Sequence, residues 1–99
     1  MRFVKTFLLT FRQLEDDIRI ITVNVNGIRA AARKGFFEWL PKQGADIVCL
    51  QEIRAQLDDI QSEKFWPENY HCFYFPAEKK GYSGVAIFSK KKPSSILEG

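Results

Sequence analysis

Two groups of polar side chains follow apolar segments of the chain, at the points where those segments end. Asn24 and Asn26 close the apolar segment 18–26, and Glu52 comes directly after the apolar segment 45–51. Side chains alternate between faces along a strand, so Asn24 and Asn26 point to the same side. Carboxylate and amide oxygens are hard ligands that suit Mg²⁺ or Mn²⁺. Brought together, these residues would form a metal site.

Each group also has a simpler interpretation. Asn26 precedes a glycine, a pair typical of tight turns, and it could cap a following helix. Glu52 could stand in the first turn of a helix, stabilised by the helix dipole, or at a solvated loop end. A third group combines lysines that attract phosphate with glycines that allow close backbone approach: Lys79-Lys80-Gly81-Tyr82-Ser83-Gly84. An ordinary hairpin turn is the simpler interpretation of that group.

The remaining reactive residue types are few. His71 is the only histidine and lies beside Cys72 in an aromatic segment, so we expect a structural role and neither a histidine-based triad nor a zinc site. Cys49 and Cys72 lie in apolar runs without the spacing of a disulfide framework. They predict free buried thiols in a reducing compartment, and hence a cytoplasmic protein. The basic run 90–92 favours a solvated surface over a binding patch.

The elements that must position these residues form a β-α-β unit with further strands. The β-branched residues of 18–26 predict a strand buried on both faces. Apolar residues recur at helical spacing from 28 to 43, with Pro41 expected to shorten or kink the helix and Gly44 to end it. The segment 45–51 predicts a parallel second strand, which places both strand ends at the edge where open α/β sheets bind ligands. We also expect a short helix and two more strands, at 56–61, 70–75 and 84–89.

The composition is that of an ordinary globular domain. The chain has 99 residues, 45% of them hydrophobic and 27% charged, with a net charge of +3. These values exclude a disordered tail, a collagen-like fibre and a disulfide-stapled miniprotein. No apolar stretch approaches the ~20 residues of a membrane span, so we expect no membrane partner. Residues 1–17 share no period with the rest, and we expect a short helix or an irregular leader there, outside a domain of residues 18–99.

Three motifs, in this order, resemble the exonuclease III family of apurinic/apyrimidinic endonucleases. They lie at 20–30, 45–54 and 80–87: Ile-Ile-Thr-Val-Asn-Val-Asn-Gly-Ile-Arg-Ala, Ala-Asp-Ile-Val-Cys-Leu-Gln-Glu-Ile-Arg and Lys-Gly-Tyr-Ser-Gly-Val-Ala-Ile. The resemblance implies an α/β fold, the N-terminal half of the four-layer α/β sandwich of the endonuclease/exonuclease/phosphatase superfamily, here incomplete. It implies Mg²⁺-dependent (or Mn²⁺-dependent) cleavage of double-stranded DNA on the 5′ side of abasic sites, with 3′-to-5′ exonuclease and 3′-phosphatase activity at 3′ ends.

The resemblance also implies roles for individual residues. Glu52 matches the family's metal-binding glutamate, with Asn24 beside it and Asn26 near the metal. The positions that contact the DNA backbone match Arg29, Ala30, Lys34, Arg54, Gly81 and Tyr82. Two positions depart from the family, since Ile53 stands where threonine is common and Ile18 where many members begin with Met.

The family's domain is much longer, with two similar halves, and this chain resembles only the first. The family's tyrosine, the Asp-x-Asn element that positions the attacking water and the closing Asp-His pair belong to the other half. No residue of this chain is therefore assigned as general base or in another catalytic role. We expect a DNA-repair nuclease that is a monomer when complete, and an isolated chain that is inactive. The alternatives are another phosphoesterase of the same superfamily and a truncated, non-catalytic nucleic-acid-binding fragment.

Overall fold

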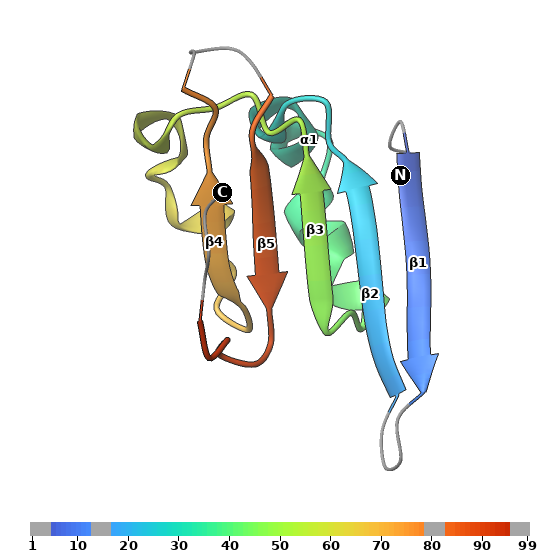
Figure 1. The fold of residues 1–99 in the computed structure, drawn as a ribbon. Helices are drawn as coiled ribbons and strands as arrows, with labels where there is room; N and C mark the ends of the chain where they lie inside the picture. Colours follow the sequence, from blue (N-terminus) through green and yellow to red (C-terminus); the bar gives the residue numbers. More distant parts are fainter. Residues whose placement is uncertain (1–4, 13–16, 79–82, 96–99) are drawn as a thin grey trace.

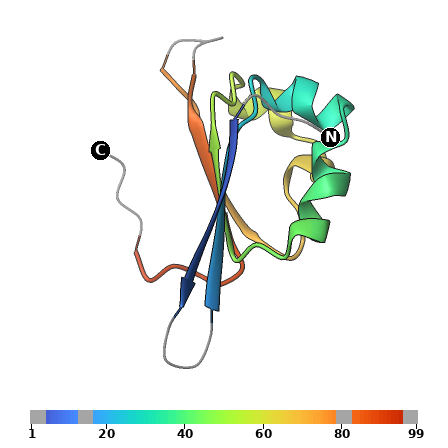
Figure 2. The same cartoon turned by 90° about the vertical axis from the view of Figure 1, so that its right-hand side faces the viewer.

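The centre of the fold is a mixed five-stranded sheet in the order β1-β2-β3-β5-β4 (Figure 1). The structure of the chain is a computed structural model, and it describes residues 5–12, 17–78 and 83–95. The strands are β1 (Lys5–Arg12), β2 (Asp17–Asn24), β3 (Ile47–Gln51), β4 (His71–Phe75) and β5 (Val85–Ser89). Helical segments form a layer on one face of the sheet (Figure 2): α1 (Ile28–Arg33), α2 (Phe36–Trp39) and the 3₁₀ turns η1 (Leu40–Gln43), η2 (Leu57–Ile60) and η3 (Glu63–Phe65).

The expected β-α-β unit is confirmed. β2 and β3 are parallel neighbours joined by the helical crossover, with Ile20 opposite Ile47 and Asn24 opposite Gln51. β5 pairs antiparallel with both β3 and β4. The two parallel strands therefore end at the same edge of the sheet, the upper edge in Figure 1.

The helix predicted over residues 28–43 is divided into three pieces, which corrects that prediction. α1 is six residues long, and Gly35 then adopts a φ of 95°, outside the helical region. α2 follows and gives way to 3₁₀ geometry at Leu40, next to Pro41. Proline has no N–H to donate, so the α-helical hydrogen bonds cannot continue there.

The N-terminal segment forms a strand where the sequence analysis predicted a short helix or an irregular leader. β1 runs antiparallel to β2, from Lys5 opposite Asn24 to Arg12 opposite Asp17. The prediction was wrong because it depended on a period shared with neighbouring segments, whereas a strand at a sheet edge is stabilised by pairing with its partner. That residues 1–17 lie outside the family's domain stays a prediction.

The core lies between the helical layer and one face of the sheet. Its buried side chains alternate along the strands and recur along the helices: Ile21, Val23, Val48, Leu50, Ala86 and Phe88, with Ile28, Phe36, Leu40, Ile60 and Phe65. On the other face, Val85 and Ile87 are 44% and 39% exposed. Burial also alternates along β2, so the prediction of a strand buried on both faces is wrong for the described residues.

Tyr74 offers a test of how the core is held together. Its hydroxyl donates a hydrogen bond to the Phe65 carbonyl at 2.6 Å, and both residues are buried. Burial, with a smaller contribution from Cys72, raises the pKa of Tyr74, so it remains a donor at all ordinary pH values. Tyr74→Phe should lower the free energy of unfolding by about 1–2 kcal/mol, because it leaves a buried acceptor without its donor. Urea unfolding followed by circular dichroism measures this change.

Tyr70→Phe is the matched control. The Tyr70 hydroxyl donates to the Ala45 carbonyl at 2.7 Å, in a less buried position. Loss of this hydroxyl should lower the free energy of unfolding by less than Tyr74→Phe does, because water can replace the donor more easily. If both variants lower the free energy of unfolding by the same amount, burial does not determine the strength of these hydrogen bonds.

Candidate metal and nucleic-acid site

The candidate site lies at the carboxyl ends of β2 and β3. Asn24 is the last residue of β2 and pairs with Gln51, the last residue of β3, so Glu52 follows at the same edge. Parallel pairing therefore brings Asn24 and Glu52 together, as the sequence predicts. Open α/β sheets commonly bind ligands at this edge.

Backbone hydrogen bonds hold the segment after β3 from two sides. Gly27 donates to the Glu52 carbonyl at 2.8 Å, and Ile28 donates to the Ile53 carbonyl at 2.9 Å. On the other side, the Ile53 amide donates to the Gly84 carbonyl at 3.2 Å. The Ile53 side chain is fully buried. The segment is irregular in conformation but, like a strand inside a sheet, has backbone hydrogen bonds on both sides.

Gly84 allows this close packing. Its φ is 91°, and a Cβ atom at this position would lie 3.0 Å from the backbone nitrogen of Ala77 and 3.1 Å from Ile53 Cγ1. The carbonyl oxygen of Phe75 would lie at 3.2 Å. Two of these three neighbours are backbone atoms, and the positive φ is itself strained for any L side chain, so this position strongly favours glycine.

The side chains around Glu52 form a hydrogen-bonded set. Asn24 Nδ2 donates to Glu52 Oε2, and Asn24 Oδ1 accepts the backbone N–H of Asn26 at 3.0 Å. Arg54 Nη2 donates to Glu52 Oε1 at 2.7 Å. Each carboxylate oxygen therefore has a donor, and the Glu52 side chain is 34% exposed to solvent.

The backbone at the site has an unusual conformation. Among the described residues, the non-glycine positions with positive φ are Asn26 at 47°, Glu52 at 53° and Arg54 at 50°. Asparagine tolerates this left-handed region, whereas glutamate and arginine seldom adopt it. All three of these residues belong to the predicted site.

The predicted DNA-binding residues fall into two sets. Arg29 joins the site directly, since its Nη2 donates to the Arg54 carbonyl at 3.2 Å and its Nη1 lies 3.6 Å from Asp59 Oδ1. Ala30 is half-buried within α1, and Lys34 is exposed just after it. The structure thus brings Arg54 to Glu52 and Arg29 to the backbone of Arg54, and places Lys34 farther along the crossover.

Gly81 and Tyr82, the other predicted DNA contacts, lie outside the described residues. The sequence analysis missed Asp59, which forms the ion pair with Arg29. Asp59 Oδ2 also accepts the backbone N–H of Gln56 at 2.9 Å, as part of a capping box at the start of η2. The spacing of Gln56 and Asp59 was the available signal for this residue.

The donor set fits a hydrated hard cation. Glu52 offers a carboxylate, whereas Asn24 turns its amide nitrogen to that carboxylate and its Oδ1 accepts the Asn26 N–H. Mg²⁺ binds through one or two carboxylates and keeps several waters. Within residues 5–12, 17–78 and 83–95, no three His, Cys, Asp or Glu side chains form a group that could hold a metal ion. A softer metal that needs several protein ligands does not fit these residues.

The histidine and the cysteines lie away from the site. His71 is opposite Ser89, which is itself opposite Ile47, so it stands at the end of the sheet opposite to Glu52. Both cysteines are free and half-buried. Desolvation raises the pKa of Cys49 and raises that of Cys72 to about 11, so both thiols are protonated at neutral pH and are poor nucleophiles.

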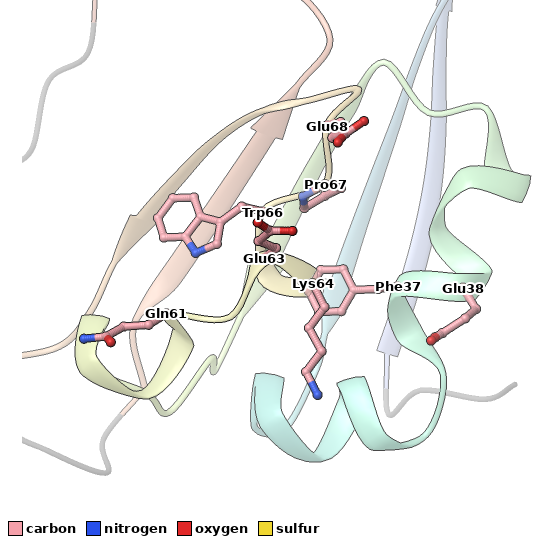
Figure 3. A pocket seen from close by; sticks show the side chains of 8 residues that line it. All are labelled: Phe37, Glu38, Gln61, Glu63, Lys64, Trp66, Pro67 and Glu68. Carbon is pink, nitrogen blue, oxygen red and sulfur yellow. The ribbon is translucent and has the colours of Figure 1, made fainter.

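An open groove of about 630 Å³ lies elsewhere, between α2 and η3 (Figure 3). Its lining includes three carboxylates and one lysine: Phe37, Glu38, Gln61, Glu63, Lys64, Trp66, Pro67 and Glu68. None of the predicted site residues lines it. The excess of negative charge disfavours a polyanion such as DNA, so this groove is not the candidate site.

Comparison with known proteins finds similarity to nucleases and to a 3′ phosphatase. The chain is 43% identical over 83 residues to an exodeoxyribonuclease of Bacillus subtilis, covering 83% of this chain and 32% of that protein. It resembles the structure of an AP endonuclease from Archaeoglobus fulgidus with a TM-score of 0.70 and 32% identity, covering 83% of this chain and 31% of that one. It also resembles a 3′ phosphatase from Neisseria bound to a product DNA hairpin, with a TM-score of 0.66, 29% identity, and coverage of 81% and 30%.

The chain spans about a third of the length of these proteins. In the described part of the chain, no helix has the length and apolar character needed to cross a membrane. The sequence pattern of the endonuclease/exonuclease/phosphatase family matches residues 21–98, which is well over half of the chain. By this match, and by the α/β fold and its relatives, the chain belongs to the endonuclease/exonuclease/phosphatase family.

Proposed function

We propose that the chain is part of a DNA-repair nuclease that hydrolyses phosphodiester bonds with Mg²⁺ or Mn²⁺. The observation that carries this proposal is the placement of Glu52 at the carboxyl ends of two parallel strands, in a left-handed backbone conformation. That conformation costs a non-glycine residue about 1–2 kcal/mol. Strain of this kind is concentrated at functional sites, where the surrounding structure compensates for it.

The residues around Glu52 support a role in phosphate chemistry. A divalent ion bound there would polarise a phosphate oxygen and stabilise the negative charge that grows in the transition state. Asn24 orients the carboxylate by donating to Oε2. The backbone hydrogen bonds of Gly27 and Ile28 keep the carboxylate at a fixed place on the sheet edge.

We infer that the substrate is double-stranded DNA with abasic sites or 3′ ends. The relatives are named exodeoxyribonuclease and AP endonuclease, and a related 3′ phosphatase is bound to a DNA hairpin. Cationic side chains lie at the site and along the crossover, and they can contact phosphates. The proposed backbone contacts are Arg29, Ala30, Lys34, Arg54, Gly81 and Tyr82.

We also propose that groups outside this chain complete the catalytic centre. His71 lies at the opposite end of the sheet and cannot activate water beside Glu52. The exposed side chains of Val85 and Ile87 support packing of the open sheet face against a second sheet. In this proposal residues 18–99 are the N-terminal part of a four-layer α/β sandwich, monomeric when complete.

The free thiols of Cys49 and Cys72 are consistent with a cytoplasmic location.

The first test is incision of a duplex that carries one abasic site. The 99-residue chain with Mg²⁺ should leave the duplex intact, because none of the groups in the part of the chain that the structure describes is placed to activate the attacking water. Denaturing gel electrophoresis measures this, with chelator and Glu52→Gln as controls. Incision that requires both metal and Glu52 would confirm the nuclease and contradict the need for outside groups. Turnover of a soluble phosphomonoester without action on the duplex would favour another phosphoesterase instead.

A second test addresses DNA binding. Lys34→Ala should weaken binding to any duplex and reduce the slope of log affinity against log salt by about 0.9, as expected for the loss of one phosphate contact. Lys42→Ala is the matched control, since Lys42 is also an exposed lysine of the crossover but lies next to the opposite edge of the sheet. Fluorescence anisotropy at several KCl concentrations measures both variants. Equal slopes for the two variants would contradict the assignment of Lys34.

A third test concerns the strain at Glu52. Glu52→Gly and Glu52→Ala both remove the side chain, but only glycine relieves the left-handed backbone. The glycine variant should therefore be more stable by about 1 kcal/mol, the reverse of the order at an ordinary position. Urea unfolding of the two variants gives this difference. If the alanine variant is the more stable of the two, the backbone at Glu52 is not strained.

A further inference from the structure

Arg54 is held so that its guanidinium reaches the carboxylate two residues before it. Its amide donates to the Ser83 carbonyl at 3.0 Å, and its own carbonyl accepts from Arg29 Nη2 at 3.2 Å. Its left-handed φ of 50° completes the turn that begins at Glu52. Because the backbone is fixed on both sides, the contact between the two side chains does not depend on a flexible loop.

The two partners of the Glu52 carboxylate differ in charge. Asn24 is a neutral donor to Oε2, whereas Arg54 Nη2 brings a full positive charge to within 2.7 Å of Oε1. A carboxylate has about four lone-pair sites, so a metal ion and the amide of Asn24 can share it. A dication and a guanidinium repel each other at this distance, so a metal ion on this carboxylate competes with the contact from Arg54.

We propose that Arg54 is the resident counter-cation of Glu52, which pairs with the carboxylate when no divalent ion is bound and leaves it when one binds. This inference deepens the proposed function, because it rests on Glu52 being the metal ligand. It assigns to Arg54 the role of a positioning residue that sets the apparent affinity for Mg²⁺. The Arg54 side chain is 48% exposed, so it has solvent to move into.

The exchange also links the metal to the nucleic acid. A guanidinium displaced from Glu52 has five N–H donors free at the edge where phosphate is proposed to bind, and it suits bidentate contact with phosphate oxygens. Binding of Mg²⁺ to Glu52 should therefore free the Arg54 guanidinium to contact a phosphate group of the DNA.

The test is titration of the 99-residue chain with MgCl₂ in isothermal calorimetry, without DNA. Arg54→Gln removes the competing charge and should raise the Mg²⁺ affinity by about two- to five-fold, the range that a partly exposed ion pair supports. Arg54→Asn should do the same, and asparagine suits the left-handed backbone if the glutamine variant folds poorly. Arg33→Gln is the charge-matched control, since Arg33 is exposed at the end of α1, and should leave the affinity unchanged.

Glu52→Gln separates failure of this inference from failure of the proposed metal site. If the wild-type chain binds Mg²⁺ through Glu52 and the Arg54 variants bind with equal or lower affinity, the site stands and the counter-cation role is overturned. An equal gain in the Arg33 variant would also overturn it, because the effect would then be one of net charge. If neither the wild type nor the Arg54 variants show binding that depends on Glu52, both proposals are wrong.

Discussion

The parallel pairing of β2 and β3 continues beyond the last residues of both strands, and the candidate site depends on this continuation. Val25 donates to the Gln51 carbonyl at 3.1 Å, and the amides of Gly27 and Ile28 extend the same row of hydrogen bonds. The segment that carries Glu52 is thereby part of the sheet although its conformation is irregular. A polar group at a strand end usually lies on a loop with few fixed contacts, but here the backbone that carries it is hydrogen-bonded to the continuation of β2.

The β-α-β unit could be predicted because it rests on local patterns. The β-branched run around Ile21 and the apolar stripe through Phe36 identify the elements, and the rule for parallel strands places their ends together. The break at Gly35 could not be predicted, since an isolated glycine within a helical pattern is usually tolerated. β1 was missed because its conformation is decided by the free edge of β2, a neighbour in space and not in sequence.

The meeting of Asn24 and Glu52 at one edge of the sheet could be predicted, but the contacts within the candidate site could not. The polar types at positions 24 and 52 point to hard-cation chemistry in any fold that joins them. The ion pair between Glu52 and Arg54 depends on two left-handed residues separated by one buried isoleucine, and propensity assigns neither conformation to those residue types. Ile53 itself is fully buried in the core cluster, where its side chain serves packing.

Gly84 contributes no side chain to this arrangement, yet it is as constrained as any residue that does. The space for a side chain is closed by the backbone of Ala77 and Phe75 and by Ile53, the residue between Glu52 and Arg54. A methyl group at 84 would push against the turn that presents both charged residues. In a deep mutational scan, position 84 would accordingly show the intolerance of an active-site residue. A map of functional positions drawn from such a scan would then include a residue that has no side chain, because its smallness sets the distance between β5 and the turn that carries Glu52 and Arg54.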